Sequence, residues 1–497
     1  MNLYTLPDKS MAATGADPQL SDVAPARVME IELGEPLPMI TAFDDKKGKR
    51  YQRVLCLVRL HTRPLGVVEF TLERDELDAG TCAGQIWSML REQINEHLRQ
   101  DGLPPVTVFE AGGLPTSGTP LCIEERERFL AHAPFVSVIV PTHDRPEFVQ
   151  ASLRALTTLH YPCYEVIIVD NAPSSAATAD FVRQTYGDVP RIRYVREDRP
   201  GVSWARNRGI MAARGAILAF TDDDVVVDRY WLAELIRPFS LVENVACVTG
   251  QVLPLELETP AQFWYERYGG SYWFLWKGRS SWWSTRHIFD LKQHRLDDPL
   301  YPYRAGQFGC GASMACTADF LREVRGFDPA LGGNGPSRCA QDIAVLFQVV
   351  ARGYTLVYEP TSVVYHLNRR DYKALSRQIY NYGIGMTAYL TRSLLDNPRL
   401  LFDFIPKTMV AFVRPLVGKA TRRDEPVDSY PRELTVLKLK GMLYGPLAYI
   451  QSWWMARKLH GRHGRDISGP YGGEVIAPCL SEAAMVPTLE KECRHGE

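Results

Sequence analysis

Residues 135–141, FVSVIVP, and residues 164–170, YEVIIVD, are two unbroken apolar runs, and the stretch between them, 146–159, has helical spacing. A strand that is apolar at every position is typical of a parallel strand buried on both faces. Two such strands joined by a helix form a βαβ unit. The alternation of helical stretches and strands continues at residues 177–186, 191–197, 203–214 and 216–220. We therefore predict an α/β domain with a doubly wound sheet.

Three consecutive acids follow the last apolar run, in the sequence TDDDVVVD at residues 221–228. They stand at the carboxyl end of a predicted strand, where open α/β sheets bind their ligands. Alternating acids on an extended segment, here Asp222 and Asp224, can point together at one Mg²⁺ or Mn²⁺ ion, which takes oxygen ligands. The natural partner of such an ion is a nucleotide diphosphate. The alternative is a solvated acidic loop.

The two preceding strands also end in polar residues, PTHDR at 141–145 and DNA at 170–172. Neither stretch contains GxGxxG or GxxxxGK[ST], so a Rossmann dinucleotide site and a P-loop are both disfavoured. A nucleotidyltransferase is disfavoured too, because PTHDRP is not a glycine-rich basic loop. Asp170 could accept a hydrogen bond from the N–H of a pyrimidine ring, or it could cap the following helix.

An ordered set of segments resembles the motifs of family 2 glycosyltransferases of GT-A fold. These segments are SVIVPTHDRP at 137–146, VIIVDNA at 166–172, RPGVSWARNRGI at 199–210, AFTDDDVVVD at 219–228, GCGASMACT at 309–317, GFDPALGGNG at 326–335 and HLNRR at 366–370. Each motif is weak singly, but their order is specific. The resemblance implies a mixed GT-A sheet. It also implies metal-dependent transfer of a sugar from a nucleotide-diphosphate donor to a glycan or lipid-linked acceptor, with inversion at the anomeric carbon.

The resemblance also assigns roles to individual residues. Arg206 corresponds to the basic residue near the nucleotide base and the diphosphate. Asp222, Asp223 and Asp224 correspond to the DXD element, in which Asp222 and Asp223 lie against the nucleotide. The metal ligands implied are Asp222, Asp224 and His366, with Mn²⁺ or Mg²⁺ as the ion, although His366 could instead be a structural histidine. The residues that correspond to the lining of the nucleoside pocket are Pro141, Thr142, Asp144 and Asp170.

The catalytic base is expected at the start of a helix that follows a glycine-rich segment. Family members place Glu and then Asp there, whereas this chain has Gln341 followed by Asp342. The apolar spacing that follows predicts an amphipathic helix beginning near Asp342, whose free N–H groups would keep the carboxylate ionised. Asp342 could instead be only the helix N-cap. Because an amide cannot replace an acid in charge pairing, Gln341 leaves an alternative open: a catalytically silent protein that binds nucleotide sugars for regulation or scaffolding.

The composition disfavours several classes of protein. Lys and Arg number 57 and Asp and Glu 58, so no overall positive charge recruits nucleic acid, and we expect no such partner. The ten cysteines form no CxxC pair, which argues against a zinc module and a disulfide framework and favours a reducing cytoplasm. No signal peptide and no spanning helix are expected. We therefore expect a cytoplasmic protein, or one that is peripheral at the inner face of the membrane.

The expected domain organisation has five parts. The two ends of the chain look disordered, because they are rich in small and polar residues. In order, the parts are a disordered N-terminus at 1–26, a small accessory α/β domain at 27–130, the GT-A catalytic domain at 131–370, a C-terminal helical region at 371–465 and a flexible tail at 466–497. The accessory domain has no chemical signature. Its predicted helix at 83–98 carries Glu92, Glu96 and His97, which are best explained as a solvated face.

Two further segments have more than one interpretation. Five tryptophans lie within residues 262–290, where they could pack in the core, bind the acceptor or approach lipid; they are Trp264, Trp273, Trp276, Trp282 and Trp283. The C-terminal region is expected to be helical, with breaks at Pro406, Pro415 and Pro431. Its apolar and basic residues favour either peripheral contact with a membrane or a helical cap on the catalytic domain.

Overall fold

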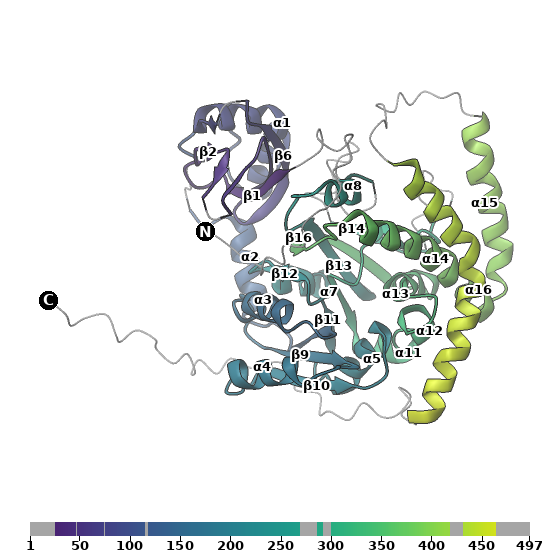
Figure 1. Ribbon diagram of the computed structural model, residues 1–497. Helices are drawn as coiled ribbons and strands as arrows, with labels where there is room; N and C mark the ends of the chain where they lie inside the picture. The colour runs from purple at the N-terminus through teal and green to yellow at the C-terminus, as the bar shows by residue number, and fades with distance from the viewer. Residues whose placement is uncertain are drawn as a thin grey trace.

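The computed structural model describes residues 25–45, 47–73, 75–114, 118–268, 286–291, 300–417 and 431–463. These residues form a large mixed sheet, a smaller N-terminal unit and a group of C-terminal helices (Figure 1). The strands of the large sheet are β8 (Val136–Thr142), β9 (Tyr164–Asn171), β10 (Ile192–Glu197), β11 (Ile217–Phe220), β12 (Val225–Val227), β13 (Val245–Pro254), β14 (His287–Phe289), β15 (Met314–Thr317) and β16 (Thr355–His366). The predicted fold class is confirmed, and the exact domain bounds stay a prediction.

The order of strands explains why the sheet is mixed. It reads β10-β9-β8-β11-β15-β13-β16-β12, and β14 pairs with β16. β8 is parallel to β9 and β11, whereas β15 runs antiparallel to both β11 and β13. Every residue of β8 and β9 is buried, as their apolar runs predicted.

Helices from several parts of the chain pack on this sheet. α5 lies against β8, β9 and β10, and α6 lies against β13, β15 and β16. Trp231, at the start of α6, is fully buried and donates a hydrogen bond from Nε1 to Ser313 Oγ at 2.9 Å. The helices of this domain are α3 (Pro146–Thr157), α4 (Ala177–Tyr186), α5 (Val202–Ala212), α6 (Trp231–Ile236), α7 (Pro238–Leu241), α8 (Pro260–Tyr268), α11 (Ala318–Glu323), α12 (Pro329–Gly332) and α13 (Gln341–Ala351), with a 3₁₀ turn at Ala305–Gln307.

The N-terminal unit has its own hydrophobic core. Its three-stranded sheet has the order β1-β5-β6 and packs against the long helix α1. Its elements are β1 (Ala26–Glu32), β2 (Ile40–Thr41), β3 (Phe43–Asp44), β4 (Lys49–Arg50), β5 (Arg53–Leu60), β6 (Arg63–Thr71), β7 (Glu76–Leu77) and α1 (Ala79–Gln100). The helix α2 (Leu121–Leu130) then leads into the domain of the large sheet (Figure 1).

Charged side chains join the N-terminal unit to the domain of the large sheet. Arg59 of β5 is buried and pairs with Glu30 and with Asp228, both at 3.1 Å. Asp228 closes the acidic segment TDDDVVVD, so this acid serves the junction between the two units. A second contact centres on Glu258, which accepts hydrogen bonds from Lys47 at 2.7 Å and from Lys49.

The C-terminal helices are longer than expected from breaks at the prolines. They are α14 (Tyr372–Asp396), α15 (Leu400–Val417) and α16 (Arg432–His463). α15 includes Pro406 and Pro415, so the breaks expected there are absent, whereas α16 does begin directly after Pro431. α16 packs along α14 and α12, where Ser452 Oγ accepts a hydrogen bond from Ser337 N at 2.9 Å. This part of α16 therefore covers the domain of the large sheet.

None of the helices in the described part of the chain combines the length and the apolarity that crossing a bilayer requires. The expected disordered ends, apart from residues 25 and 26, and Trp273, Trp276, Trp282 and Trp283 lie outside the described residues. Trp264 is buried, and its ring packs edge-on against Tyr372 with centroids 5.8 Å apart. This tryptophan therefore packs in the core.

Candidate active site

The three consecutive acids lie in the turn between β11 and β12. Their backbone is fixed on both sides, because Thr221 N donates to Ile139 O of β8 at 3.3 Å and Leu367 N donates to Asp224 O at 3.0 Å. β12 pairs with β16 so that Val225 lies opposite His366. This register brings the end of β16 next to the acids, at the carboxyl end of the parallel strands.

The three carboxylates point to different partners. Asp222 accepts a hydrogen bond from Arg206 Nη2 at 2.8 Å, and Asp223 accepts one from Thr142 Oγ1 at 2.8 Å. Asp224 Oδ1 lies 3.4 Å from His366 Nε2. Asp224 and His366 are therefore the pair that the structure brings together, while Asp222 lies on the side of Arg206.

His366 is oriented as metal-binding histidines usually are. Its Nδ1–H donates a hydrogen bond to Asn368 Oδ1 at 2.8 Å, and this bond turns Nε2 towards Asp224. Burial by itself lowers the pKa of the imidazole, but the carboxylate of Asp224 outweighs burial and raises the pKa to about 9. In return, His366 lowers the pKa of Asp224 against the opposing effect of burial.

Arg145 is a further site residue that sequence reasoning missed. Its Nη1 lies 3.6 Å from Asp223 Oδ1 and 3.7 Å from Asp224 Oδ2. Burial raises the pKa of Asp223, and the adjacent Asp224 raises it further, whereas Arg145 lowers it. The positive charge of Arg145 thus offsets the negative charge of two buried acids. It ends the quoted motif PTHDR, and its position three residues after Thr142 was the available signal.

Arg206 lies on α5 and is almost completely buried. Besides its bond to Asp222, it approaches the carbonyl oxygen of Gly311 at 3.4 Å and stacks over the ring of Phe327 at 5.3 Å. Its Nε and Nη1 atoms have no hydrogen-bond partner among the described residues. Buried guanidinium donors without partners are costly, and an anionic ligand such as a diphosphate would satisfy them.

The residues beside Arg206 explain why its segment reads ARNRG. Asn207 holds Phe327 by two hydrogen bonds of 2.8 Å, one to its N–H and one to its carbonyl oxygen. Gly209 lies so close to Ile139 of β8 that a Cβ would come within 2.4 Å. The helix can therefore approach the sheet closely and carry Arg206 to the acids.

The residues expected around the nucleoside lie on adjacent strands. Thr142 and Asp170 are register partners at the ends of β8 and β9, next to Pro141. Asp170 is buried; its Oδ2 accepts from the Tyr194 hydroxyl at 2.9 Å, while its Oδ1 has no partner among the described residues. Burial raises the pKa of this carboxyl, although the Tyr194 hydroxyl lowers it. The Oδ1 atom could therefore accept a hydrogen bond from the N–H of a nucleotide base.

Asp144 lies in the loop that follows β8. Its backbone is in the left-handed region, with φ of 52°, and its Oδ1 accepts a hydrogen bond from Ser174 N at 2.9 Å. This bond ties the loop after β8 to the loop after β9. Asp144 therefore shapes the edge of the expected nucleoside pocket, and the hydrogen bond from Ser174 lowers its pKa.

Asp342 is the second residue of α13, and Ala340 is the N-cap, so the interpretation of Asp342 as N-cap is wrong. Its Oδ2 accepts a hydrogen bond from Gly311 N at 2.7 Å. Since Arg206 approaches the carbonyl oxygen of the same glycine, Gly311 joins the expected base to the acids. Burial raises the pKa of the neighbouring Cys310 thiol to about 12, and the carboxylates of Asp342 and Asp222 act in the same direction.

Gln341 opens α13 beside Asp342 and is buried. Its Oε1 has no hydrogen-bond partner among the described residues. A Cβ on Gly332 would lie 3.1 Å from this oxygen, so the amide faces the glycine-rich segment 326–335. A hydroxyl donor could satisfy it.

The residues present fit a divalent cation with a diphosphate. Asp224 offers an oxygen ligand just before β12, and His366 offers a nitrogen ligand at the end of the paired strand β16. The negative charge of Asp222 also acts on His366 and raises its pKa. Mg²⁺ and Mn²⁺ commonly take few protein ligands and complete their shell with phosphate oxygens and water. Arg206 would then supply donors to the same phosphates.

Comparisons with known proteins agree with the motifs. Residues 137–306 match the family described as Glycosyl transferase family 2. The glycosyltransferase AglE of Haloferax volcanii is 41% identical over 102 residues, which cover 20% of this chain and 33% of the relative. The pre-mycofactocin glycosyltransferase of Mycobacterium tuberculosis is 25% identical over 235 residues, which cover 47% of this chain and 43% of the relative. The chain thus spans less than half the length of these curated relatives.

Among solved structures, the mannosyltransferase PcManGT from Pyrobaculum calidifontis, in complex with GDP-Man and Mn²⁺, is 16% identical, with a TM-score of 0.38. The match covers 70% of this chain and 95% of that chain.

Proposed function

We propose that the chain, whose residues 137–306 match glycosyl transferase family 2, is a metal-dependent inverting glycosyltransferase. It would move a sugar from a nucleotide-diphosphate donor to a glycan or a lipid-linked acceptor. One observation carries this proposal. Gly311 contacts both Arg206 and Asp342, so the donors for a leaving diphosphate and a base for an incoming hydroxyl meet at one residue.

Each residue has a part in the proposed reaction. Asp342 accepts the proton of the acceptor hydroxyl, whose oxygen attacks the anomeric carbon on the face opposite the diphosphate. The bond between the sugar and the diphosphate breaks, and the free N–H groups of Arg206 donate to the leaving group. A divalent ion held by Asp224 and His366 would neutralise part of the diphosphate charge. Asp170 would hold the base of the nucleotide through a hydrogen bond.

The test measures release of nucleoside diphosphate from a panel of UDP-, GDP- and dTDP-sugars in the presence of Mn²⁺. We expect Asp342→Asn to lower kcat by at least about 100-fold, because general bases contribute on that order. Asp224→Asn should lower turnover strongly, and added Mn²⁺ should not restore it. Asp319→Asn is the matched control, since Asp319 is exposed and pairs only with Arg322 of its own helix among the described residues. Full activity in both site variants would refute the proposal.

Gln341 supports a second candidate, a catalytically silent protein that binds nucleotide sugars. Its Oε1 has no hydrogen-bond partner among the described residues, and the resemblance implies an acid at this position. This candidate predicts that the protein binds a nucleotide in calorimetry and turns over no donor. It also predicts that Gln341→Glu gains turnover, because only the acid is missing. Donor turnover by the unchanged protein would exclude it.

We further propose that the C-terminal helices contact an anionic lipid surface, which would give access to a lipid-linked acceptor. α16 exposes an apolar stripe in which Leu443 is 85% exposed, and α15 exposes Phe402 at 84%. The stripe on α16 consists of Val436, Leu439, Leu443, Leu447, Ile450 and Trp454. Exposed Lys440, Arg457 and Lys458 on the same helix suit anionic headgroups.

Flotation with vesicles tests this contact. The chain should float with vesicles that contain phosphatidylglycerol and not with phosphatidylcholine alone, and Leu443→Glu should abolish flotation. Val108→Glu is the control, because Val108 is also an exposed apolar residue, at 60%, but lies in the N-terminal region. Concentration-dependent dimers that Leu443→Glu disrupts, without flotation, would show that the stripe binds a second copy instead.

A further inference from the structure

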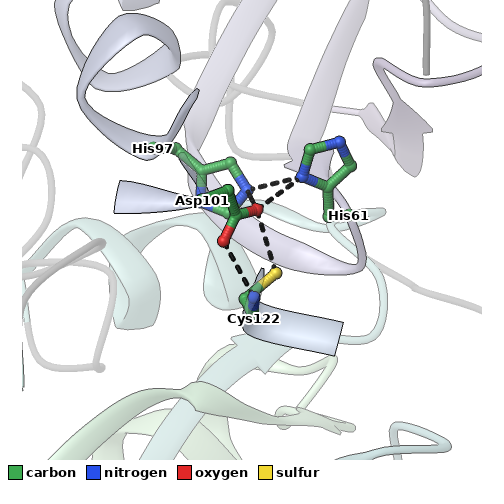
Figure 2. Close-up of side chains that lie close together, drawn as sticks. All are labelled: His61, His97, Asp101 and Cys122. Carbon is green, nitrogen blue, oxygen red and sulfur yellow. Dashed lines mark hydrogen bonds and ion pairs between the residues drawn. The ribbon is translucent and has the colours of Figure 1, made fainter. Parts of the chain in front are cut away.

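A cluster of buried polar side chains lies in the N-terminal unit, away from the proposed active site. Its members are His61, His97, Asp101 and Cys122, and each is less than 9% exposed. His61 lies in the turn between β5 and β6, His97 in the last turn of α1, Asp101 at the C-cap of that helix and Cys122 in the first turn of α2. Figure 2 shows the four side chains converging.

The contacts within the cluster centre on one carboxylate oxygen. Asp101 Oδ2 lies 2.7 Å from His61 Nδ1, 3.2 Å from His97 Nε2 and 3.1 Å from Cys122 Sγ. The two imidazole nitrogens are themselves 3.1 Å apart. One ligand atom from each residue thus lies within 4.8 Å of all the others.

When Asp101 is ionised, the ring protons alone do not satisfy all of these contacts. Asp101 Oδ2, His61 Nδ1 and His97 Nε2 are mutually within 3.2 Å. Each ring nitrogen carries at most one proton, which points in one direction. If both nitrogens donate to the carboxylate, two N–H groups face each other; if His97 Nε2 accepts from His61, two acceptors face each other. A single cation that takes a lone pair from every group removes this conflict.

The geometry and the charge both suit zinc. Tetrahedral zinc with bonds of about 2.0–2.3 Å places its ligand atoms about 3.3–3.8 Å apart, so the shortest contact of the cluster would open by about half an ångström and a pair at the 4.8 Å limit would close by about 1 Å. Two neutral imidazoles, one carboxylate and one thiolate give a Zn²⁺ site without net charge, which lowers the cost of burying it. A thiolate with imidazoles favours Zn²⁺ over Mg²⁺, Ca²⁺ and Mn²⁺. We propose that His61, His97, Asp101 and Cys122 bind one structural Zn²⁺ ion.

The position of the site indicates what the ion does. Its ligands come from the β5–β6 turn, the end of α1 and the start of α2, so the ion would join three segments of the N-terminal unit. Beyond Cys122, α2 docks on the catalytic domain, where Arg126 Nη1 lies 3.5 Å from Glu234 Oε1 of α6. Arg126 also donates to Thr62 Oγ1 at 2.8 Å, next to His61. Zinc would therefore fix α2, and with it the junction between the two units.

A nucleophilic cysteine is the other chemistry that these residue types suggest, and the structure disfavours it. The closest partner of the Cys122 thiol among these four residues is a carboxylate, which cannot hold a thiolate as an imidazolium would. The thiol is also only 4% exposed, so no substrate reaches it. Four protein ligands and no open position are typical of a structural metal site.

The test is metal analysis of the full chain, purified without a polyhistidine tag and without chelators. Mass spectrometry of the metals should find one equivalent of zinc per chain. Cys122→Ser and Asp101→Asn should each lower the zinc content at least about tenfold, since even the loss of groups that only support a ligand weakens metal sites by that much. Cys82→Ser is the matched control, a buried cysteine in α1 outside the cluster, and Asp224→Asn excludes the acids of the proposed active site.

A second readout covers variants that fold poorly. Co²⁺ added to the zinc-depleted wild-type chain should give the intense visible bands of tetrahedral cobalt with a thiolate charge-transfer band, and Zn²⁺ should displace them. Wild-type protein that contains no zinc and shows no such spectrum would overturn the proposal and leave a hydrogen-bonded cluster. Zinc retained by both Cys122→Ser and Asp101→Asn would overturn it too, because the metal would then lie elsewhere.

Discussion

Gly311→Ala isolates the part that Arg206 plays in the proposed reaction. A Cβ at Gly311 would lie 2.6 Å from both Nη1 and Nη2 of Arg206, well inside ordinary van der Waals contact, which begins at 3.4 Å. The backbone of Gly311 is outside the left-handed region, so alanine adds no backbone strain. The substitution also keeps the Gly311 N–H that donates to Asp342. The change therefore displaces the guanidinium and leaves the expected base in place.

The size of the effect follows from this displacement. The guanidinium must retreat by about 1 Å, and a misplacement of that size at a catalytic group costs roughly 100-fold in rate. Because Arg206 is buried against Phe327, it has little room to return to Asp222 in another rotamer. We expect the loss to fall mainly on kcat, since the leaving diphosphate gains charge in the transition state.

Steady-state rates with the donor that the panel identifies provide the assay. Gly112→Ala is the control, because its Cβ would meet no atom within 4 Å and its φ is also ordinary. Thermal unfolding of both variants shows whether the chain still folds. A Gly311→Ala enzyme with the kcat and KM of the parent would refute the assignment of Arg206 to the leaving group.

Three further predictions concern the nucleotide, the junction between the two units and the metal. Asp170→Asn should weaken nucleotide binding in calorimetry roughly 10- to 100-fold, the usual worth of a hydrogen bond to a charged group; unchanged affinity would argue against its contact with the base. Burial raises the pKa of Glu258, but Lys47 and Lys49 outweigh burial and lower the pKa from 4.5 to about 2. The contribution of Glu258 to the free energy of unfolding is therefore complete above pH 4.5 and is lost as the pH falls towards 2. In urea unfolding across this pH range Glu258→Gln should lose stability less steeply than the parent, and equal slopes would count against the pair. Removal of divalent metal with EDTA should abolish turnover and added Mn²⁺ or Mg²⁺ should restore it, whereas turnover that persists in EDTA would exclude a metal-dependent mechanism.

The parallel half of the sheet could be predicted from the sequence because its strands are buried on both faces. The runs at 135–141 and 164–170 agree with β8 and β9 to within one residue at each end. β15 was not predicted, since four residues carry too little periodicity, and its antiparallel direction depends on its neighbours. Proline also misled the prediction of α15, whose helix continues through Pro406 and Pro415.

The site was predicted only as far as local pattern reaches. The acids at the end of β11 could be placed from the apolar run before them. The partner of Asp224 depends on the register of β12 against β16, which only the resemblance suggested through His366. Arg145 was signalled only by its position in PTHDR, and the contacts of Gly311 with Arg206 and Asp342 form between segments far apart in the sequence, so no local pattern revealed them.

The N-terminal unit shows the same limit more sharply. Glu92 and Glu96 are exposed, as expected, but the prediction was wrong for His97, which is buried. His97 and Asp101 are four residues apart and share one face of α1, which was the only local signal of the cluster. His61 and Cys122 come from other segments, so the absence of a CxxC pair said nothing about this site.

The central claim is that the acids at the end of β11 bind a divalent cation and, through it, a diphosphate. Calorimetry of the full chain with UDP, GDP, dTDP and ADP, each with and without Mn²⁺, tests this claim most directly. The account predicts that one nucleotide binds tightly with Mn²⁺, that its affinity falls at least about tenfold without the metal, and that Asp224→Asn removes this difference. A nucleotide affinity that is the same with and without Mn²⁺ would contradict it.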